Sequence, residues 1–252
     1  MAKVYAELPN VSRQRGRAAA HWFFSGYMVS IALILFAGFA PSFFLRGVIH
    51  TPMPLRPFRL DIIIHSMVAA PLVLLLPLQA VLIFAKQVRM HIIVGRLGFG
   101  LGVALIPVLY VVGSYSYRLA PSEQLPFAPA MASLVLLALP AIAALLAVAW
   151  WKRFNAQAHK RLMVAFACLL TGPALSRMPI FPPPPAGIAF TEVAVLLLLV
   201  PLWMWDLVTR SRVHWATLAG TAIIGAQSAV RLLVMGTSGW ANFVERLPAY
   251  GT

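Results

Sequence analysis

The chain has 252 residues, of which 61% are hydrophobic and only 10% are charged, and its mean hydropathy is +0.86. A soluble domain needs roughly a quarter of its residues charged, so this composition excludes a soluble globule and predicts a protein dissolved in lipid. The net charge of +14 comes from short Lys and Arg clusters between apolar runs, which predicts contact with anionic lipid headgroups rather than with nucleic acid.

The first segment, residues 1–21, is polar and basic, and we expect it to form a cytoplasmic N-terminal segment. An apolar run follows from Trp22 to Leu45. This run is longer than the apolar core of a signal peptide and long enough to cross a membrane. We therefore expect it to stay in the protein as the first membrane span.

Seven apolar runs follow one another along the chain. Backbone groups cannot stay unpaired in lipid, so each run of about 20 apolar residues predicts a membrane-spanning helix. No connecting segment is long enough to fold separately, so the predicted fold class is all-α, a polytopic bundle of seven transmembrane helices over residues 22–236 with a short periplasmic tail, 237–252. The predicted spans are residues 22–45, 61–85, 91–115, 128–150, 159–177, 189–207 and 215–236.

The distribution of cations predicts the orientation of the bundle. If the N-terminus is cytoplasmic, thirteen Lys and Arg residues, including all four lysines, lie inside and seven arginines lie outside. Short cytoplasmic loops carry an excess of Lys and Arg, so this count favours a cytoplasmic N-terminus. We expect a multi-pass protein of the bacterial inner membrane.

Four histidines stand at predicted helix starts on the cytoplasmic side: His21, His91, His159 and His214. An amphipathic imidazole is stable at a membrane interface, which is one interpretation. The helix dipole disfavours a charged imidazole at a helix N-terminus, so a neutral ring with a nitrogen free to accept or ligate is expected. His91 and His159 are therefore candidate axial ligands of a haem b iron, with Arg96 and Lys160 near its propionates.

The second span carries Asp61 and His65 four residues apart, which places both on one helix face. The carboxylate can then orient the imidazole. An ionisable group inside a membrane helix is a candidate functional residue, although an Asp–His pair that only holds a neighbouring helix is the alternative interpretation. Gln79 lies near the same face, and we expect it to bond across the bundle.

Polar side chains from several spans are predicted to gather in the outer half of the bundle: Asp61, His65, Tyr115, Arg177, Glu192 and Arg231. One interpretation is that Glu192 pairs with Arg177 or Arg231 only to cancel charge. The other is that the arginines hold an anion or another small polar ligand. Gln79 belongs to this candidate ligand set.

Four motifs carry a resemblance to a group of uncharacterised bacterial multi-spanning membrane proteins: HSMVAAPLVLLLPLQ, MHIIVGRLG, HKRLM and RVHWATLAG. The likeness extends from about residue 60 to 235 and includes Gly95 and Arg96. The chain departs from the pattern at Ile92 and Ile93, where basic residues are usual, and at Trp215, where proline is common. The histidines at helix starts also resemble membrane cytochromes of the b561 type, which implies haem held by two histidines.

These observations leave three functional classes open. The first is a redox membrane protein that uses haem b or a quinone. The second is a small-molecule transporter, or a ligand-binding or accessory subunit, that uses the outer polar cluster. The third is a membrane enzyme, but the H-x-x-x-H and H-x-x-H-H spacings of zinc hydrolases and di-iron desaturases are absent, and the last predicted helix lacks the lysine that retinal needs.

Overall fold

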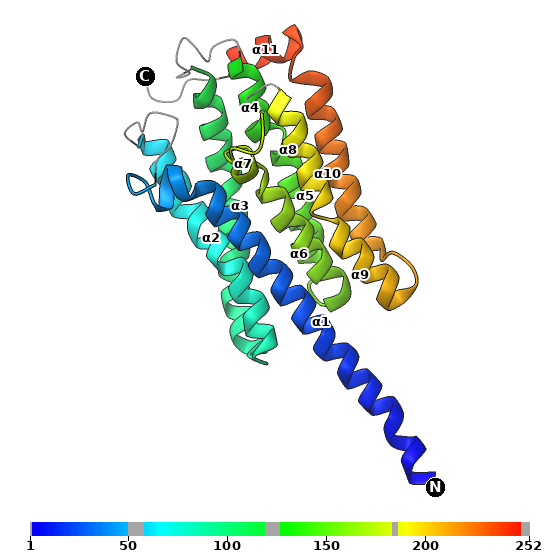
Figure 1. Cartoon of the computed structure of the whole chain (residues 1–252). Coiled ribbons are helices and arrows are strands. Elements are labelled where there is room, and N and C mark those ends of the chain that lie inside the picture. The colour runs from blue at the N-terminus through cyan, green and yellow to red at the C-terminus, as the bar shows by residue number, and fades with distance from the viewer. Residues whose placement is uncertain (1, 50–57, 119–126, 183–185, 248–252) are drawn as a thin grey trace.

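The structure is a computed structural model that describes residues 2–49, 58–118, 127–182 and 186–247. Figure 1 shows a bundle of aligned helices, with the N-terminal part of α1 extending beyond it. Helix α1 (Ala2–Phe39) continues into the short π-helix η1 (Ala40–Phe44), whose wider turn brings the amide of Leu45 to the carbonyl of Ala40 at 2.7 Å. The remaining helices are α2 (Leu60–Phe84), α3 (Val88–Arg118), α4 (Ala128–Leu136), α5 (Leu139–Trp151), α6 (Ala156–Leu170), α7 (Gly172–Leu175), α8 (Ala186–Leu197), α9 (Val200–Arg210), α10 (Trp215–Val234) and α11 (Ser238–Glu245).

Two of the crossings are broken helices. Helices α4 and α5 meet just before Pro140, and α8 and α9 meet just before Pro201. Proline has no amide hydrogen and crowds the preceding turn, so the α-helical hydrogen-bond ladder cannot continue through it. The backbone tightens there instead, and the amide of Ala138 donates to the carbonyl of Val135 at 3.2 Å.

Six helical stretches of the described chain are long and apolar enough to cross a membrane: 18–44, 60–84, 88–115, 128–151, 186–210 and 215–234. They correspond to six of the seven predicted runs. The predicted run 159–177 is instead made of α6, a turn at Thr171 and the four-residue α7. Helix α6 has 15 residues, so it rises only about 22 Å, which is less than the roughly 30 Å of a hydrocarbon core.

The position of α6 explains why it can be short. It contacts α1, α5, α8 and α10, and Leu162, Phe166 and Cys168 are fully buried. Helix α10 approaches it so closely that a Cβ on Gly220 would lie 2.6 Å from the Cβ of Ala165. The interrupted backbone is therefore enclosed by protein, where a bilayer tolerates it.

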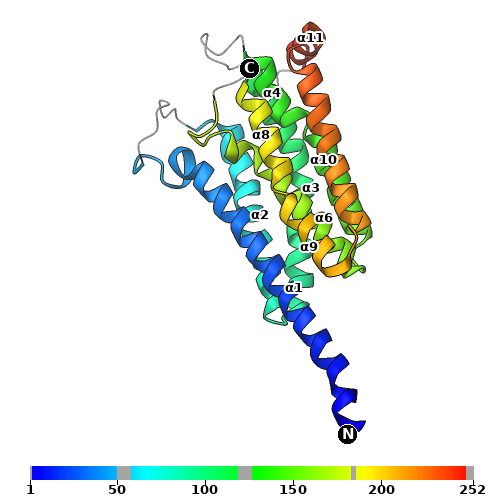
Figure 2. The ribbon, with the colours of Figure 1, turned by 45° about the vertical axis from the view of Figure 1, so that its right-hand side comes forward.

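The bundle has two distinct ends. The turns at 85–87, 152–155 and 211–214 lie together at the end that we call the hairpin end, and α11 lies at the opposite end, the α11 end (Figures 1 and 2). The hairpin end is the one predicted to be cytoplasmic. The predicted tail is partly folded, because α11 packs on α4 and Trp240 Nε1 donates to the carbonyl of Pro129 at 2.7 Å.

Candidate functional site

A cavity of about 440 Å³ lies inside the half of the bundle nearer the α11 end. Side chains from α1, η1, α2, α3, the α4–α5 break, α6, α8 and α10 form its walls. Most of these side chains are apolar, such as those of Leu72 and Leu105. The polar members of the wall are Ser42, His65, Ser66, Arg177, Glu192, Gln227 and Arg231. Four of them belong to the outer cluster predicted from the sequence.

His65 contributes an unsatisfied polar atom to this wall. Among the described residues, its Nδ1 is the buried side-chain nitrogen or oxygen that has no hydrogen-bond partner. A buried polar atom without a partner costs about 1–3 kcal/mol. His65 is therefore a wall residue with an unsatisfied ring nitrogen, and that nitrogen is covered by neighbouring atoms.

Arg177 follows α7 and lines the same cavity, and part of its side chain is exposed. Its Nη1 donates to the carbonyl of Pro173 at 2.5 Å, and its guanidinium lies 4.8 Å from the ring centroid of Phe39. Within the described part of the chain, no carboxylate lies within ion-pair distance of it. Because a guanidinium carries five N–H donors, Arg177 has donors left for an acceptor group.

Glu192 of α8 and Arg231 of α10 form a buried ion pair, with side chains 4% and 5% exposed. Ser228 donates to the second carboxylate oxygen of Glu192 at 2.5 Å. This supports the interpretation that Glu192 cancels the charge of Arg231, and it identifies Arg231 rather than Arg177 as the partner. The cation left over in the cavity wall is therefore Arg177.

Arg231 also completes the broken α4–α5 crossing. Its Nη2 donates to the carbonyl of Leu134 at 3.0 Å, and its Nε donates to the carbonyl of Ser133 at 3.1 Å. In a continuous helix Leu134 would accept from Ala138, but that amide is turned toward Val135. Arg231 thus satisfies a carbonyl that the break released, and its role in the wall is structural.

The other predicted members of the outer cluster lie outside the cavity. Asp61 accepts hydrogen bonds from Arg59, at 3.0 Å from Nε and 2.5 Å from Nη2, and no hydrogen bond joins it to His65. Arg59 also lies 5.9 Å from the ring centroid of Tyr115. These three residues form a separate group at the start of α2, and the expected orientation of His65 by Asp61 is not observed.

Gln79 lies at the hairpin end, far along α2 from His65, and it clamps α2 to α3. His91 Nδ1 lies 3.2 Å from the backbone oxygen of Gln79. When the side-chain amide of Gln79 is oriented so that both its nitrogen and its oxygen are hydrogen-bonded, the nitrogen donates to the carbonyl of His91 at 2.9 Å and the oxygen accepts from the amide of Gly95 at 3.1 Å. A Cβ on Gly95 would lie 3.2 Å from the Gln79 side chain, so glycine makes this approach possible.

The other predicted haem residues are arranged in a similar way. His159 Nδ1 lies 3.0 Å from the carbonyl oxygen of Ala149, which ties the start of α6 to the end of α5. Lys160 Nζ lies 4.2 Å from the ring centroid of Phe24 on α1, and Arg96 is exposed. In the Gln79 orientation given above, the Gln79 amide also donates to His91 Nδ1 at 2.7 Å. Neither His91 nor His159 lines the cavity.

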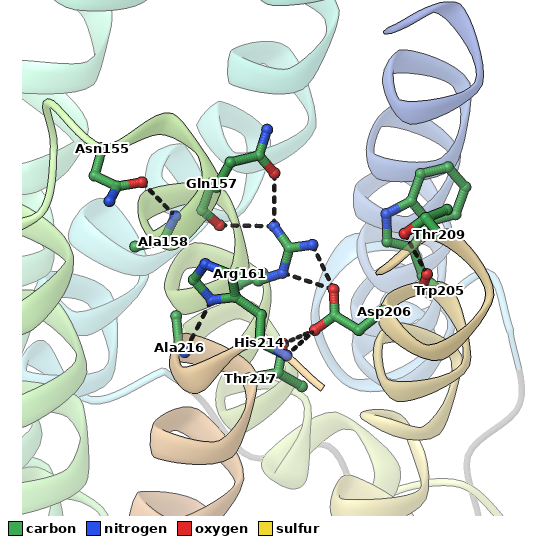
Figure 3. A network of polar contacts seen from close by, with 10 residues as sticks. All are labelled: Asn155, Gln157, Ala158, Arg161, Trp205, Asp206, Thr209, His214, Ala216 and Thr217. Atoms are coloured by element: carbon green, nitrogen blue, oxygen red, sulfur yellow. Dashed lines mark hydrogen bonds and ion pairs between the residues drawn. The ribbon is translucent and has the colours of Figure 1, made fainter. Parts of the chain in front are cut away.

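A polar network at the hairpin end joins α6, α9 and α10 (Figure 3). Arg161 and Asp206 form an ion pair whose side chains are 1% and 0% exposed. The second oxygen of Asp206 accepts from the amide of His214 at 3.0 Å and from the hydroxyl of Thr217 at 2.6 Å. Arg161 in turn donates to the backbone and side-chain oxygens of Gln157 at 2.8 and 2.9 Å.

This network was not among the predicted site residues. A sequence signal for it exists, because Asp206 is an acid at the end of an apolar run that continues into the basic segment TRSRV. His214 in this arrangement is the N-cap of α10, and its Nδ1 accepts from the amide of Ala216 at 3.0 Å. The histidines at three helix starts therefore each bond backbone at a hairpin turn or helix start.

Comparisons with protein families, curated proteins and solved structures find no match to this chain. What the fold itself establishes is a helical protein with several membrane-crossing helices.

Proposed function

We propose that this protein binds a small, mostly apolar molecule with one polar head inside its membrane-embedded bundle. The observation that carries the proposal is the cavity of about 440 Å³, whose mostly apolar wall includes His65, Arg177 and the neutralised Glu192–Arg231 ion pair. Nδ1 of His65 has no hydrogen-bond partner, and Arg177 has no carboxylate partner among the described residues. Ligand pockets of proteins have volumes of roughly 300–1,000 Å³ and combine apolar walls with a few polar groups. A carrier, a receptor or a ligand-binding subunit would use such a site.

The charge of the wall indicates the chemistry of the head. Glu192 and Arg231 cancel, so Arg177 gives the polar end a net positive charge. A head with acceptor oxygens, and above all an anionic one, would receive hydrogen bonds from Arg177. His65 adds a nitrogen that can donate to the same head or accept from it, depending on its tautomer.

The haem b interpretation finds less support. Its two ligands, His91 and His159, are each held by Nδ1 at a backbone oxygen of the preceding helix, and neither lines the cavity. Lys160 and Arg96 do not converge on a shared space between them, because Lys160 lies over Phe24 and Arg96 is exposed. Haem binding stays a prediction of the sequence, and no step of the proposed function depends on it.

The proposed threading has seven crossings, with α6 and α7 as a fifth crossing enclosed by the other helices. The support is that the α5–α6 turn lies at the hairpin end while α8 begins near the α11 end (Figure 1). With a cytoplasmic N-terminus, residues 86 and 160 face the cytoplasm. Accessibility of single cysteines placed at 86 and 160 tests this, and labelling of either from the periplasm would contradict the orientation.

The proposed function is tested by ligand-dependent thermal stability of the purified protein in lipid nanodiscs. The probes are decanoate, decyl phosphate and decanol, which share a chain and differ in the head. We expect an anionic probe to raise the Tm of the wild type and of Arg96→Gln, which changes an exposed cation away from the cavity. Arg177→Gln should lose this shift. Equal shifts in Arg177→Gln and Arg96→Gln, or no shift with any probe, would overturn the proposal.

A further inference from the structure

A second hollow, of about 420 Å³, lies on the flank of α2 next to the cavity. Its lining residues are Phe43, Phe58, Ile63, Ser66, Met67, Ala70 and Pro71. Four of these, Phe43, Phe58, Ser66 and Ala70, also line the inner cavity. The two spaces therefore lie next to each other and share these four side chains.

The outer hollow opens toward lipid. Met67 is 71% exposed and Ile63 is 43% exposed, and both lie on α2, which is one of the candidate membrane spans. Exposed apolar side chains on a membrane helix contact hydrocarbon chains rather than water. A molecule that reaches the hollow therefore arrives from the bilayer.

The boundary between the two spaces is built from small residues on one side and aromatic rings on the other. Ser66 and Ala70 are four residues apart and therefore lie on one face of α2, where their small side chains leave a depression. Opposite them stands Phe43, whose ring centroid lies 5.7 Å from that of Phe58. Phe43 belongs to η1, the π-helical turn that follows the end of α1.

We infer that the ligand is a single-chain amphiphile with a carboxylate head that moves sideways from the bilayer into the cavity between η1 and α2. We call the passage formed by Phe43, Phe58, Ser66 and Ala70 the portal. The head lies between Arg177 and His65, where a guanidinium fork matches a carboxylate. The chain lies along the apolar wall. A cavity of about 440 Å³ suits one drug-sized molecule, which favours one chain over a two-chain phospholipid.

This inference rests on the proposed function, and one experiment separates the two. The probe is a dansyl-labelled undecanoic acid supplied in nanodiscs, with both the rate of uptake and the amount bound at equilibrium followed by fluorescence. Ala70→Trp places a bulky ring in the portal. Leu74→Trp is the matched control, because Leu74 is one turn further along α2, is 69% exposed and lines neither space.

We expect Ala70→Trp to slow uptake about tenfold or more, because a chain must then pass an overpacked gap, while Leu74→Trp takes up the probe at the wild-type rate. Arg177→Gln should lower the amount bound at equilibrium. If Ala70→Trp does not fold, Ser66→Phe blocks the same passage and replaces it.

Equal uptake rates in Ala70→Trp and Leu74→Trp, with binding still lost in Arg177→Gln, would overturn the lateral route and leave the proposed function standing. Stabilisation by the water-soluble anion benzoate without binding of the fatty acid probe would overturn the amphiphile as ligand. Absence of binding by both would overturn the inference together with the proposed function.

Discussion

Replacing Asp206 by Asn tests how the hairpin end is held together. The carboxylate accepts from Arg161, from the amide of His214 and from the hydroxyl of Thr217. Asn removes the charge and turns an NH₂ group toward donors. Breaking a buried ion pair by changing one partner costs about 3–5 kcal/mol, because the other charge is left buried. Arg161 is only 1% exposed, so the full cost is expected here.

The assay is thermal unfolding in nanodiscs. For a chain of this size about 1 kcal/mol corresponds to roughly 2–4 °C, so Asp206→Asn should lower Tm by about 6–20 °C. Removing both charges in Arg161→Met/Asp206→Leu should leave a smaller loss of about 1–3 kcal/mol, from the unsatisfied donors of His214 and Thr217. Arg210→Gln, an exposed change on α9, serves as the control. A double variant no more stable than Asp206→Asn would show that the unpaired charge of Arg161 does not cause the loss of stability.

Three further predictions concern stability. Gly220→Ala should destabilise the protein by about 1–3 kcal/mol, because the new Cβ would lie 2.6 Å from Ala165. Gly225→Ala on the same helix meets no neighbouring atom and should stabilise the protein by up to about 1 kcal/mol. Denaturation of both variants compares the two effects. Gln79→Ala should loosen the α2–α3 hairpin by about 1–3 kcal/mol, seen as faster hydrogen exchange at Gly95, and unchanged exchange would contradict the clamp. Burial, together with the nearby charges of Arg161 and Arg210, lowers the pKa of His214. The unfolded chain therefore protonates this imidazole more readily than the folded protein does, and Tm should fall as the pH drops below 6.5. His214→Asn keeps a capping side chain without a titration, and an equally steep loss in that variant would contradict the assignment.

The membrane-crossing helices could be predicted from the sequence because span length and apolarity are local properties. The predicted run 61–85 and the observed α2 differ by one residue at each end, for example. The predicted run 159–177 differs more from the structure. Because this segment is buried inside the bundle and does not contact lipid, its helix can be interrupted. Gly172 and Pro173 stand at the interruption, but a sequence does not tell whether such residues face lipid or protein.

The candidate site was predicted in part. Positions near the predicted outer ends of their spans placed His65, Arg177, Glu192 and Arg231 in the same half of the bundle, and all four line the cavity. Spacing could not decide which group Asp61 would bind, because Arg59, just outside the helix, competes with His65 for its carboxylate.

The histidines at the hairpin end show a different difficulty. The partners of His91 and His159 are backbone oxygens of Gln79 and Ala149, and every residue carries a backbone oxygen. No pattern of side chains therefore distinguishes an imidazole that holds a hairpin from one that ligates a metal. The portal could not be predicted from the sequence either. Small and aromatic residues such as Ser66 and Phe43 are common in membrane helices, so their presence does not indicate a passage.

The most direct measurement of the central claim is an experimental structure of the protein in nanodiscs with a terminally brominated fatty acid. We expect the carboxylate within hydrogen-bond distance of His65 and Arg177, and the bromine along the apolar wall or in the portal beside Phe43. A structure in which the fatty acid occupies only the outer surface of the bundle, while the cavity stays closed to it, would contradict a ligand site inside the bundle.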